Sequence, residues 1–302
     1  MTDIRGIWAA AISVIDKTSL KLDVESTINH AESIIDSGAH GCVMGGSTSQ
    51  SKLVDLNSKY KLIEQLSHSK HKDKYIIAPG VDSFLDTVAL MKHALKNSFS
   101  DFLIMPPSYW PNLSDEGIYL FYAKLIEQCP EVKSICLYNF KKLSRTAFTT
   151  DLVEKLAKDF PCINAVKDSG YELWEKIRID GFAVMVGSES KLLKNLQIGN
   201  LGVISAVCNI TAPLARSVFD LFQKGIKGSE LNDLNTKLCG VRAALDSCSS
   251  GLISAIHFVK SLQNKKYETL LPPLMSLSLE EQKALLLKLK KLDFIPKKNI
   301  AA

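Results

Sequence analysis

The sequence predicts an α/β protein, a (β/α)₈ TIM barrel with a C-terminal helical extension. Three observations carry this prediction: eight short apolar runs, helical periodicity between them, and a repeat of roughly 25–30 residues per strand-helix unit. A doubly wound open sheet is the alternative, but no G-x-G-x-x-G turn follows any of the runs. A closed barrel is therefore the expected architecture.

The expected strands are nearly continuous in apolar character, which is typical of strands buried on both faces of a parallel sheet. They are residues 6–14, 41–46, 75–80, 102–107, 134–139, 163–168, 182–187 and 202–207. Between them, amphipathic segments place apolar residues on one helical face, as Val24, Ile28 and Ala31 do. These helices are expected at 24–37, 53–66, 84–95, 118–128, 150–158 and 191–198.

No further strand is expected after residue 210. Helical periodicity continues at 212–224, 231–249, 252–262 and 279–292. No Pro/Gly/Ser-rich linker divides these segments from the barrel. We therefore expect residues 1–210 to form the barrel and residues 211–302 to form a helical extension of the same structural unit.

The composition is that of a soluble globular protein, with 46% hydrophobic and 23% charged residues among 302. The net charge of +5 is weak for this length, and its densest basic run, 288–298, is interleaved with leucines. An amphipathic last helix and its tail explain that run better than nucleic-acid binding. Seven cysteines without a CxxC pair predict reduced thiols.

Membrane and metal sites are not expected either. No stretch of 18 apolar residues and no secretory leader is evident, so we expect a cytoplasmic protein without a membrane partner. The histidines show no HxxxH spacing, so no metal site is expected.

Chemistry in such a barrel is expected at the C-terminal ends of the strands. Lys167 stands there, after an apolar run. A desolvated lysine has a lowered pKa, and its neutral amine can form a Schiff base, although a lysine reaching solvent from a strand end also fits. Tyr109 and Tyr138 follow the fourth run and end the fifth, where phenols can relay protons.

Hydroxyl groups stand at three further strand ends. Ser47 and Thr48 follow Gly46 in a turn whose hydroxyls and N–H groups suit a carboxylate, although such residues also cap helices. Substrate-binding candidates at the last two runs are Gly187, Ser188, Glu189 and Ser205. The combination of hydroxyl turn, two phenols and lysine is far more specific than any single member.

These residues resemble the motifs of the dihydrodipicolinate synthase / N-acetylneuraminate lyase superfamily of Schiff-base aldolases. The resemblance covers essentially the whole chain. Its motifs are R-G-I-W-A-A from Arg5, G-S-T from Gly46, P-S-Y-W-P from Pro107, Y-N at Tyr138, A-V-K-D-S from Ala165, G-S-E from Gly187 and G-V-I-S from Gly202.

The resemblance implies a role for each matching residue. Lys167 would form an imine with a 2-oxo acid such as pyruvate, without metal or organic cofactor. Tyr138 would relay protons, completed by Thr48 and by Tyr109, which is often lent by a neighbouring subunit in this family. Ser47 and Thr48 would hold the 2-oxo acid carboxylate. A homotetramer, a dimer of dimers, is the implied assembly.

Three positions depart from the family's pattern. Ser49-Gln50 replaces the usual G-E, and Lys141 replaces the proline of Y-N-x-P. Leu143 stands where dihydrodipicolinate synthases carry an arginine, with Arg145 two residues later. We therefore expect a lyase that cleaves or forms a C–C bond to pyruvate on a sugar acid. Dihydrodipicolinate synthase, a family dehydratase and a non-catalytic 2-oxo-acid-binding descendant remain alternatives.

Overall fold

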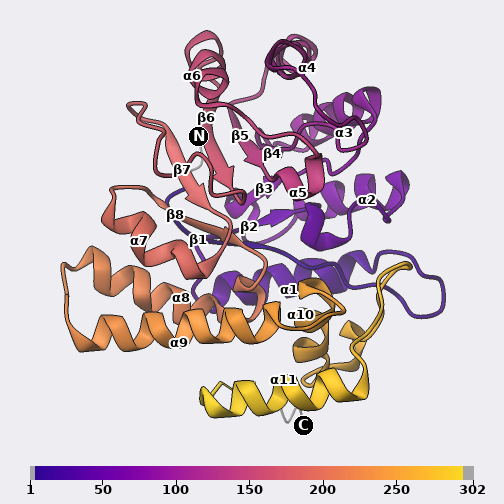
Figure 1. Ribbon diagram of the computed structural model, residues 1–302. Helices are drawn as coiled ribbons and strands as arrows, with labels where there is room; N and C mark the ends of the chain where they lie inside the picture. The colour runs from indigo at the N-terminus through magenta and orange to yellow at the C-terminus, as the bar shows by residue number, and fades with distance from the viewer. Residues whose placement is uncertain (1–3, 295–302) are drawn as a thin grey trace.

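The structure, a computed structural model, describes residues 4–294 and confirms the closed parallel barrel, with neighbouring strands in chain order (Figure 1). The strands are β1 Gly6–Ala10, β2 Gly41–Met44, β3 Tyr75–Ile77, β4 Asp101–Ile104, β5 Ser134–Asn139, β6 Ile163–Asp168, β7 Ala183–Val186 and β8 Gly202–Ser205. The barrel closes where β1 pairs with β8. The first three residues and the end of the basic run, from residue 295, lie outside the described residues.

Both faces of the strands are buried, which explains their continuous apolar character. Trp8, Val43 and Leu103 belong to one cluster, which fills the barrel. Ile7 and Phe102 alternate with them and pack in the larger cluster between strands and helices. The alternation of side chains along each strand separates the two layers.

The helices between the strands match most of the expected ranges. They are α1 Val24–Asp36, α2 Leu56–Leu66, α3 Phe84–Lys96, α4 Asp115–Gln128, a short α5 Lys141–Ser144, α6 Thr150–Asp159, α7 Leu192–Gln197 and α8 Cys208–Gln223, with 3₁₀ turns η1 Ser47–Ser49, η2 Lys72–Lys74, η3 Glu189–Lys191 and η4 Lys265–Tyr267. In five of these helices, the side chain of the N-cap residue accepts a backbone N–H of the first turn. These N-cap residues are Asp23, Asp55, Ser83, Ser114 and Thr149.

Several boundaries differ from the expectation. The helix expected from residue 53 begins at Leu56, because Asp55 caps it. The strand expected over 6–14 ends at Ala10. The expected strand-helix alternation is also broken once, since residues 169–182, all of them described, form turns and bends between β6 and β7.

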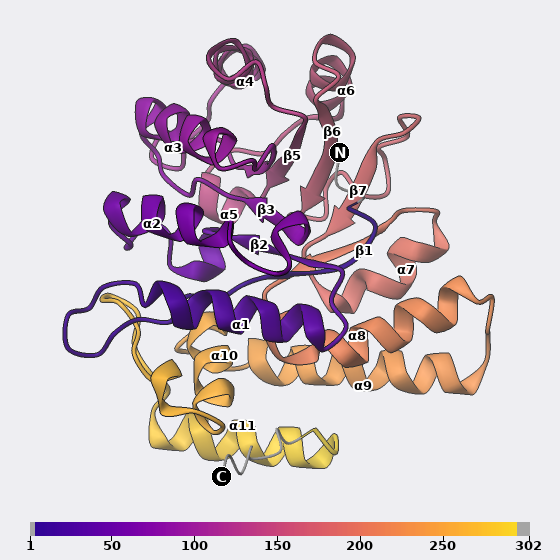
Figure 2. The ribbon, with the colours of Figure 1, turned by 180° about the vertical axis from the view of Figure 1, so that it is seen from behind.

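The C-terminal helices are α9 Ser229–Asp246, α10 Leu252–Ser261 and α11 Leu279–Lys291. Figures 1 and 2 show them on one side of the barrel, where α9 packs on α8 and α11 packs on α9. The predicted boundary at residue 210 falls inside α8, which itself packs against β1. The division into barrel and extension therefore stays a prediction, with α8 on the barrel side of the packing.

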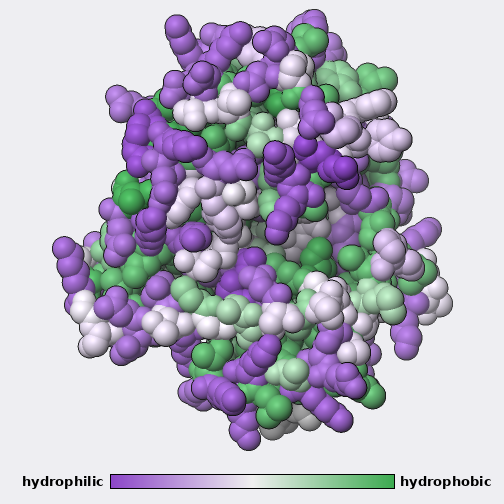
Figure 3. Space-filling view, viewed as in Figure 1, coloured by the Kyte–Doolittle hydropathy of each residue, from purple (hydrophilic) through white to green (hydrophobic). Residues whose placement is uncertain are grey.

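No helix within residues 4–294 combines the length and the apolar character that a bilayer span requires. On the face in Figure 3, hydrophilic residues cover most of the rim and hydrophobic residues form separate patches between them. The cytoplasmic location stays a prediction.

Candidate active site

Lys167 lies near the C-terminal end of β6 and points into the barrel mouth. Its side chain is only 4% exposed. Tyr138 on β5 is its direct partner in the strand register, and the Lys167 Nζ lies 4.1 Å from the centre of the Tyr138 ring. Adjacent parallel strands therefore hold the amine and the phenol side by side, as expected from their positions at two strand ends.

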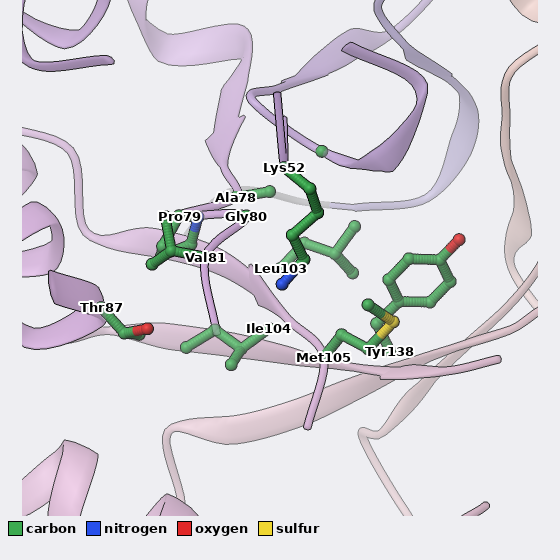
Figure 4. Close-up of a pocket in the computed structure, with 11 residues that line it drawn as sticks. Lys52, Ala78, Pro79, Gly80, Val81, Thr87, Leu103, Ile104, Met105 and Tyr138 are labelled. Carbon is green, nitrogen blue, oxygen red and sulfur yellow. The ribbon is translucent and has the colours of Figure 1, made fainter. Parts of the chain in front are cut away.

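Tyr138 connects the lysine to the hydroxyl turn. Its Oη lies 3.5 Å from the Ser47 Oγ in η1. Figure 4 shows the Tyr138 hydroxyl pointing away from a small apolar pocket, of about 40 Å³, that Leu103 and Met105 help to line. The phenol thus presents its ring to that pocket and its hydroxyl to Ser47.

A single large cavity opens over these groups. It measures about 1000 Å³ and is lined by Lys167, Tyr138, Ser47 and Thr48. Gly187 and Ser188 also line it, so six of the nine residues expected at the site meet there. The structure does not bring the other three, Tyr109, Glu189 and Ser205, to its lining.

The charge of the lining is mixed. Four basic side chains border the cavity, and these are Lys141, Lys142, Lys167 and Arg242. The two acidic ones are Glu172 and Asp246. Lys141 and Lys142 belong to α5, so the position that holds proline in the family's pattern here places a cation at the cavity rim.

The loop after β6 is shaped by Asp168. Its carboxylate accepts N–H groups from Gly170, Tyr171, Leu173 and Trp174. This holds Tyr171 in a left-handed conformation, with φ of 61°. A carboxylate that accepts so many backbone donors makes a rigid turn, and this turn replaces the helix that the barrel pattern predicts here.

Tyr171 and Ser169 were not singled out from the sequence, yet both line the cavity. Burial raises the pKa of Tyr171, although its hydrogen bond with Ser188 acts in the opposite direction. A Cβ on Gly187 would lie 2.0 Å from the Ser169 Oγ, so only glycine fits beside this loop. The sequence feature that points to Ser169 and Tyr171 is their position directly after β6, the strand that carries Lys167.

Glu189 and Ser205 are completely buried and bond to each other. The Ser205 Oγ donates to the Glu189 carboxylate at 2.7 Å, and the Cys208 thiol donates to its other oxygen at 3.2 Å. Arg242 of α9 pairs with Glu189 at 3.3 Å and with Asp246 at 2.7 Å. Burial opposes the charge of Arg242, but these carboxylates outweigh it and raise its pKa.

This arrangement gives Glu189 and Ser205 a structural task in the chain. They anchor Arg242, which itself lines the cavity, so the C-terminal extension forms part of the cavity wall. The sequence carried no signal for this contribution, because Arg242 follows Glu189 by 53 residues and lies on a helix outside the barrel strands. The expected substrate contacts of Glu189 and Ser205 stay predictions.

Tyr109 lies apart from the other candidates. It follows β4 and is 76% exposed, and the centre of its ring lies 5.2 Å from that of the neighbouring Trp110. Arg145 ends α5 in a left-handed conformation, with φ of 62°, and is exposed rather than part of the cavity lining. Neither residue reaches the lysine within this chain.

The unusual Ser49-Gln50 pair has structural partners. The Ser49 Oγ donates to the Ala11 carbonyl at 2.7 Å. The Gln50 side-chain oxygen accepts the N–H of Leu271 at 2.7 Å, which ties the hydroxyl turn to the C-terminal extension. A neutral amide thus takes the place of the family's carboxylate.

No metal is suggested by the donor set. Among residues 4–294, no three His, Cys, Asp or Glu side chains are placed to hold an ion together. The cavity brings together an amine, phenols and hydroxyls, with charged side chains at its border.

Comparison with known proteins agrees with this geometry. The model of the dihydrodipicolinate synthetase family matches residues 3–292. A DapA-like lyase of Chloroflexus aurantiacus is 26% identical over 94% of this chain and 96% of its own length. A 4-hydroxy-tetrahydrodipicolinate synthase of Listeria monocytogenes is 26% identical over 68% of this chain and 70% of its own length.

Solved structures share the fold at lower identity. The Escherichia coli prophage protein YagE, solved in complex with pyruvate, superposes with a TM-score of 0.84 at 19% identity, covering 96% of this chain and 99% of its own. Dihydrodipicolinate synthase DapA-2 of Bacillus anthracis gives 0.86 at 23% identity, covering 98% and 100%. The family match over nearly the whole chain, together with the lysine, phenol and hydroxyl turn at one barrel mouth, shows that this chain belongs to the dihydrodipicolinate synthetase family and is a lyase of that family.

Proposed function

We propose that this protein is a Schiff-base 2-oxo-acid aldolase that uses Lys167 to cleave or form a C–C bond to pyruvate. The observation that carries the proposal is the buried lysine beside Tyr138 and Ser47 at the mouth of one large cavity. The amine, the proton-relaying phenol and the carboxylate-binding turn are the three groups that imine chemistry needs.

In the proposed cleavage, the Lys167 amine attacks the C2 carbonyl and water leaves as the iminium forms. Tyr138 passes its own hydroxyl proton to the neighbouring hydroxyl relay as it accepts the proton of the C4 hydroxyl. The C3–C4 bond breaks, and its electron pair passes to the iminium to form an enamine. An aldehyde leaves, C3 takes up the proton that the Tyr138 relay holds, and water hydrolyses the imine to give pyruvate and free Lys167. The Ser47-Thr48 turn holds the carboxylate throughout. No metal or organic cofactor takes part.

The substrate that we propose is a sugar acid. The cavity of about 1000 Å³ exceeds what pyruvate fills, and hydroxyl groups from Ser169, Ser188 and Tyr171 border it. Leu143 stands where an arginine would receive a substrate carboxylate, and Arg145 lies outside the lining. Both features favour a polyhydroxylated aldehyde over aspartate semialdehyde.

Tyr109 enters the proposal through assembly. Its exposure and distance from the cavity lining fit a residue that completes the relay in a neighbouring subunit. We therefore propose a homotetramer built from dimers. Sedimentation measurements on wild type and Tyr109→Phe would report the assembly, because the phenylalanine keeps the exposed ring.

Borohydride trapping with pyruvate tests the mechanism. We expect a reduced pyruvyl adduct on the Lys167 peptide. Lys59 is a matched internal control, because it is also buried and burial lowers its pKa to about 8, but its Nζ donates to the carbonyls of Pro79 and Gly80 away from the large cavity. An adduct on Lys59 alone, or none, would exclude the mechanism.

The substrate is tested separately. Purified protein is assayed with a panel of 2-keto-3-deoxy sugar acids for pyruvate release, and with pyruvate plus aspartate semialdehyde for condensation. Pyruvate release from a sugar acid supports the proposal. Loss of water without pyruvate release would indicate a dehydratase, and trapping without turnover of any substrate would indicate a binding protein.

A further inference from the structure

The first turn of α10 forms another wall of the same cavity. Ser250, Gly251, Leu252, Ile253 and Ser254 all line it. Figures 1 and 2 show α10 outside the ring of strands, so the cavity extends from Lys167 inside the barrel to a helix of the C-terminal extension. A long substrate bound at Lys167 can therefore reach this turn.

The first turn of α10, like that of α9, has no side-chain cap. Its N-cap is Gly251, which supplies no side-chain acceptor. The backbone N–H groups of Leu252, Ile253 and Ser254 have no acceptor among the described residues. Free N–H groups at a helix start carry partial positive charge and favour an anionic acceptor.

A second observation points to a ligand at the same place. Ser254 is only 2% exposed, it lines the cavity, and its hydroxyl has no hydrogen-bond partner in the described structure. A buried hydroxyl without a partner costs free energy that a bound group can recover. The hydroxyl adds a fourth donor to the three N–H groups.

The neighbouring turn shows which ligand chemistry this region accepts. The Glu281 carboxylate of α11 accepts the Ser250 N–H at 2.8 Å and the Ser250 hydroxyl at 2.7 Å. These hydrogen bonds, with those of Ser249 and Ser278, lower the pKa of Glu281 to about 2. The hydrogen-bond donors of Ser249 and Ser250, next to α10, thus already stabilise one carboxylate. The donors of the first turn of α10 line the cavity and have no acceptor.

We infer that the first turn of α10 and the Ser254 hydroxyl bind a second carboxylate of the substrate, at the end of the chain opposite to the 2-oxo acid. The inference rests on the proposed function, because Lys167 defines the other end. The charge of the lining agrees, since Lys141 and Lys142 border the same cavity without taking part in the imine chemistry. The substrate would then be a sugar acid that carries a carboxylate at both ends of its chain.

Binding of matched ligand pairs tests the inference. 2-Oxoglutarate, 2-oxoadipate and 2-oxopimelate are compared with 2-oxo monoacids of equal carbon number, by calorimetry and by competition with pyruvate trapping. At the chain length that reaches α10, we expect the diacid to bind roughly tenfold tighter, as charge-assisted hydrogen bonds allow. Equal binding of diacid and monoacid at every chain length would overturn the inference.

Two serine variants of the same helix locate the effect. Ser254→Ala should lower the diacid preference several-fold and leave pyruvate trapping on Lys167 unchanged. Ser261→Ala is the control, because its hydroxyl donates to Phe258 at the far end of α10. If Ser254→Ala does not fold, Ser254→Cys keeps the size and weakens the donor. A preference that these Ser254 variants leave intact would overturn the inference.

The two proposals fail in different ways. Absence of a pyruvyl adduct in wild type would exclude the Schiff-base mechanism, while calorimetry would still measure diacid binding at α10. A normal adduct without diacid preference would exclude the α10 site alone.

Discussion

The side chains around Lys167 divide into those that can react and those that hold them in place. Lys167 and Tyr138 lie side by side because they are register partners on neighbouring strands. Their contact therefore depends on how each side chain is oriented at the end of its strand. Gly187 and Asp168 have no part in the proposed chemistry but shape the loop beside it. Substitutions at the two kinds of residue should therefore affect different measurements.

Tyr138→Phe removes the relay and keeps the ring against Lys167. We expect kcat to fall by about 10²–10⁴, the usual contribution of a positioned proton donor. Pyruvate trapping on Lys167 should persist. Tyr60→Phe is the control, since its ring packs on His93 away from the cavity. Unchanged kcat in Tyr138→Phe would remove the phenol from the mechanism.

Gly187→Ala tests the close approach of β7 to the loop after β6. The new Cβ would meet Ser169 at 2.0 Å, so we expect the free energy of unfolding to fall by about 1–3 kcal/mol. Gly117→Ala is the matched control, because its Cβ would find only an ordinary contact at 3.6 Å in α4. Urea denaturation of both variants measures the difference, and equal stability would contradict the predicted clash.

At the scale of elements, the loop over residues 169–182 replaces a helix because one carboxylate organises it. Asp168 accepts four backbone N–H groups there and the Asn139 amide from β5. The cavity residues Ser169 and Tyr171 follow it directly in the chain. Their positions therefore depend on a single buried side chain.

Asp168→Asn replaces the charged acceptor by an amide of the same shape. Hydrogen bonds to charged groups are each worth roughly 1.5–3 kcal/mol, so we expect a clear loss of stability and faster amide exchange at Gly170, Tyr171 and Leu173. Asp151→Asn, on the exposed side of α6, should change neither. Exchange rates measured by mass spectrometry check the loop, and unchanged rates would refute its dependence on the carboxylate.

Much of the fold could be predicted from the sequence, because buried strands and capped amphipathic helices leave local patterns. Lys167, Tyr138 and Ser47 could be placed at strand ends for the same reason. The loop after β6 could not, since its order comes from Asp168 bonding within a stretch that has no period. Arg242 and Ser254 could not either, because contacts between the extension and the cavity leave no spacing in the sequence.

At the scale of the whole molecule, two buried histidines connect the extension to the barrel. The Tyr267 hydroxyl bonds the His30 Nδ1 at 3.0 Å, and the His30 Nε2 meets the Asn209 side chain at 2.8 Å. His257 bonds the Tyr267 carbonyl at 2.9 Å. Burial lowers the pKa of His30 to about 3 and that of His257 to about 4.

These histidines should make the free energy of unfolding fall as the pH is lowered. Each imidazole binds a proton more weakly in the folded protein than in the unfolded chain, where its pKa is about 6.5. Their contribution is therefore complete above pH about 6.5 and is lost as pH falls toward the folded values. We expect the free energy of unfolding in urea to fall as the pH is lowered from about 6.5 to about 4, the range that these shifts define.

His257→Gln should flatten this dependence, because glutamine does not titrate. His68→Gln is the control, since His68 is exposed and should leave the slope as in wild type. Equal slopes in wild type and His257→Gln would show that other groups cause the acid sensitivity.

The ion pair between Glu189 and Arg242 has a consequence for biosynthesis. The ribosome makes all eight strands before it reaches α9, so a nascent barrel carries a buried carboxylate whose guanidinium partner has not yet been synthesised. An isolated buried charge is strongly unfavourable. The emerging barrel should therefore pack completely around β7 and β8 only after α9 has left the exit tunnel and Arg242 can pair with Glu189.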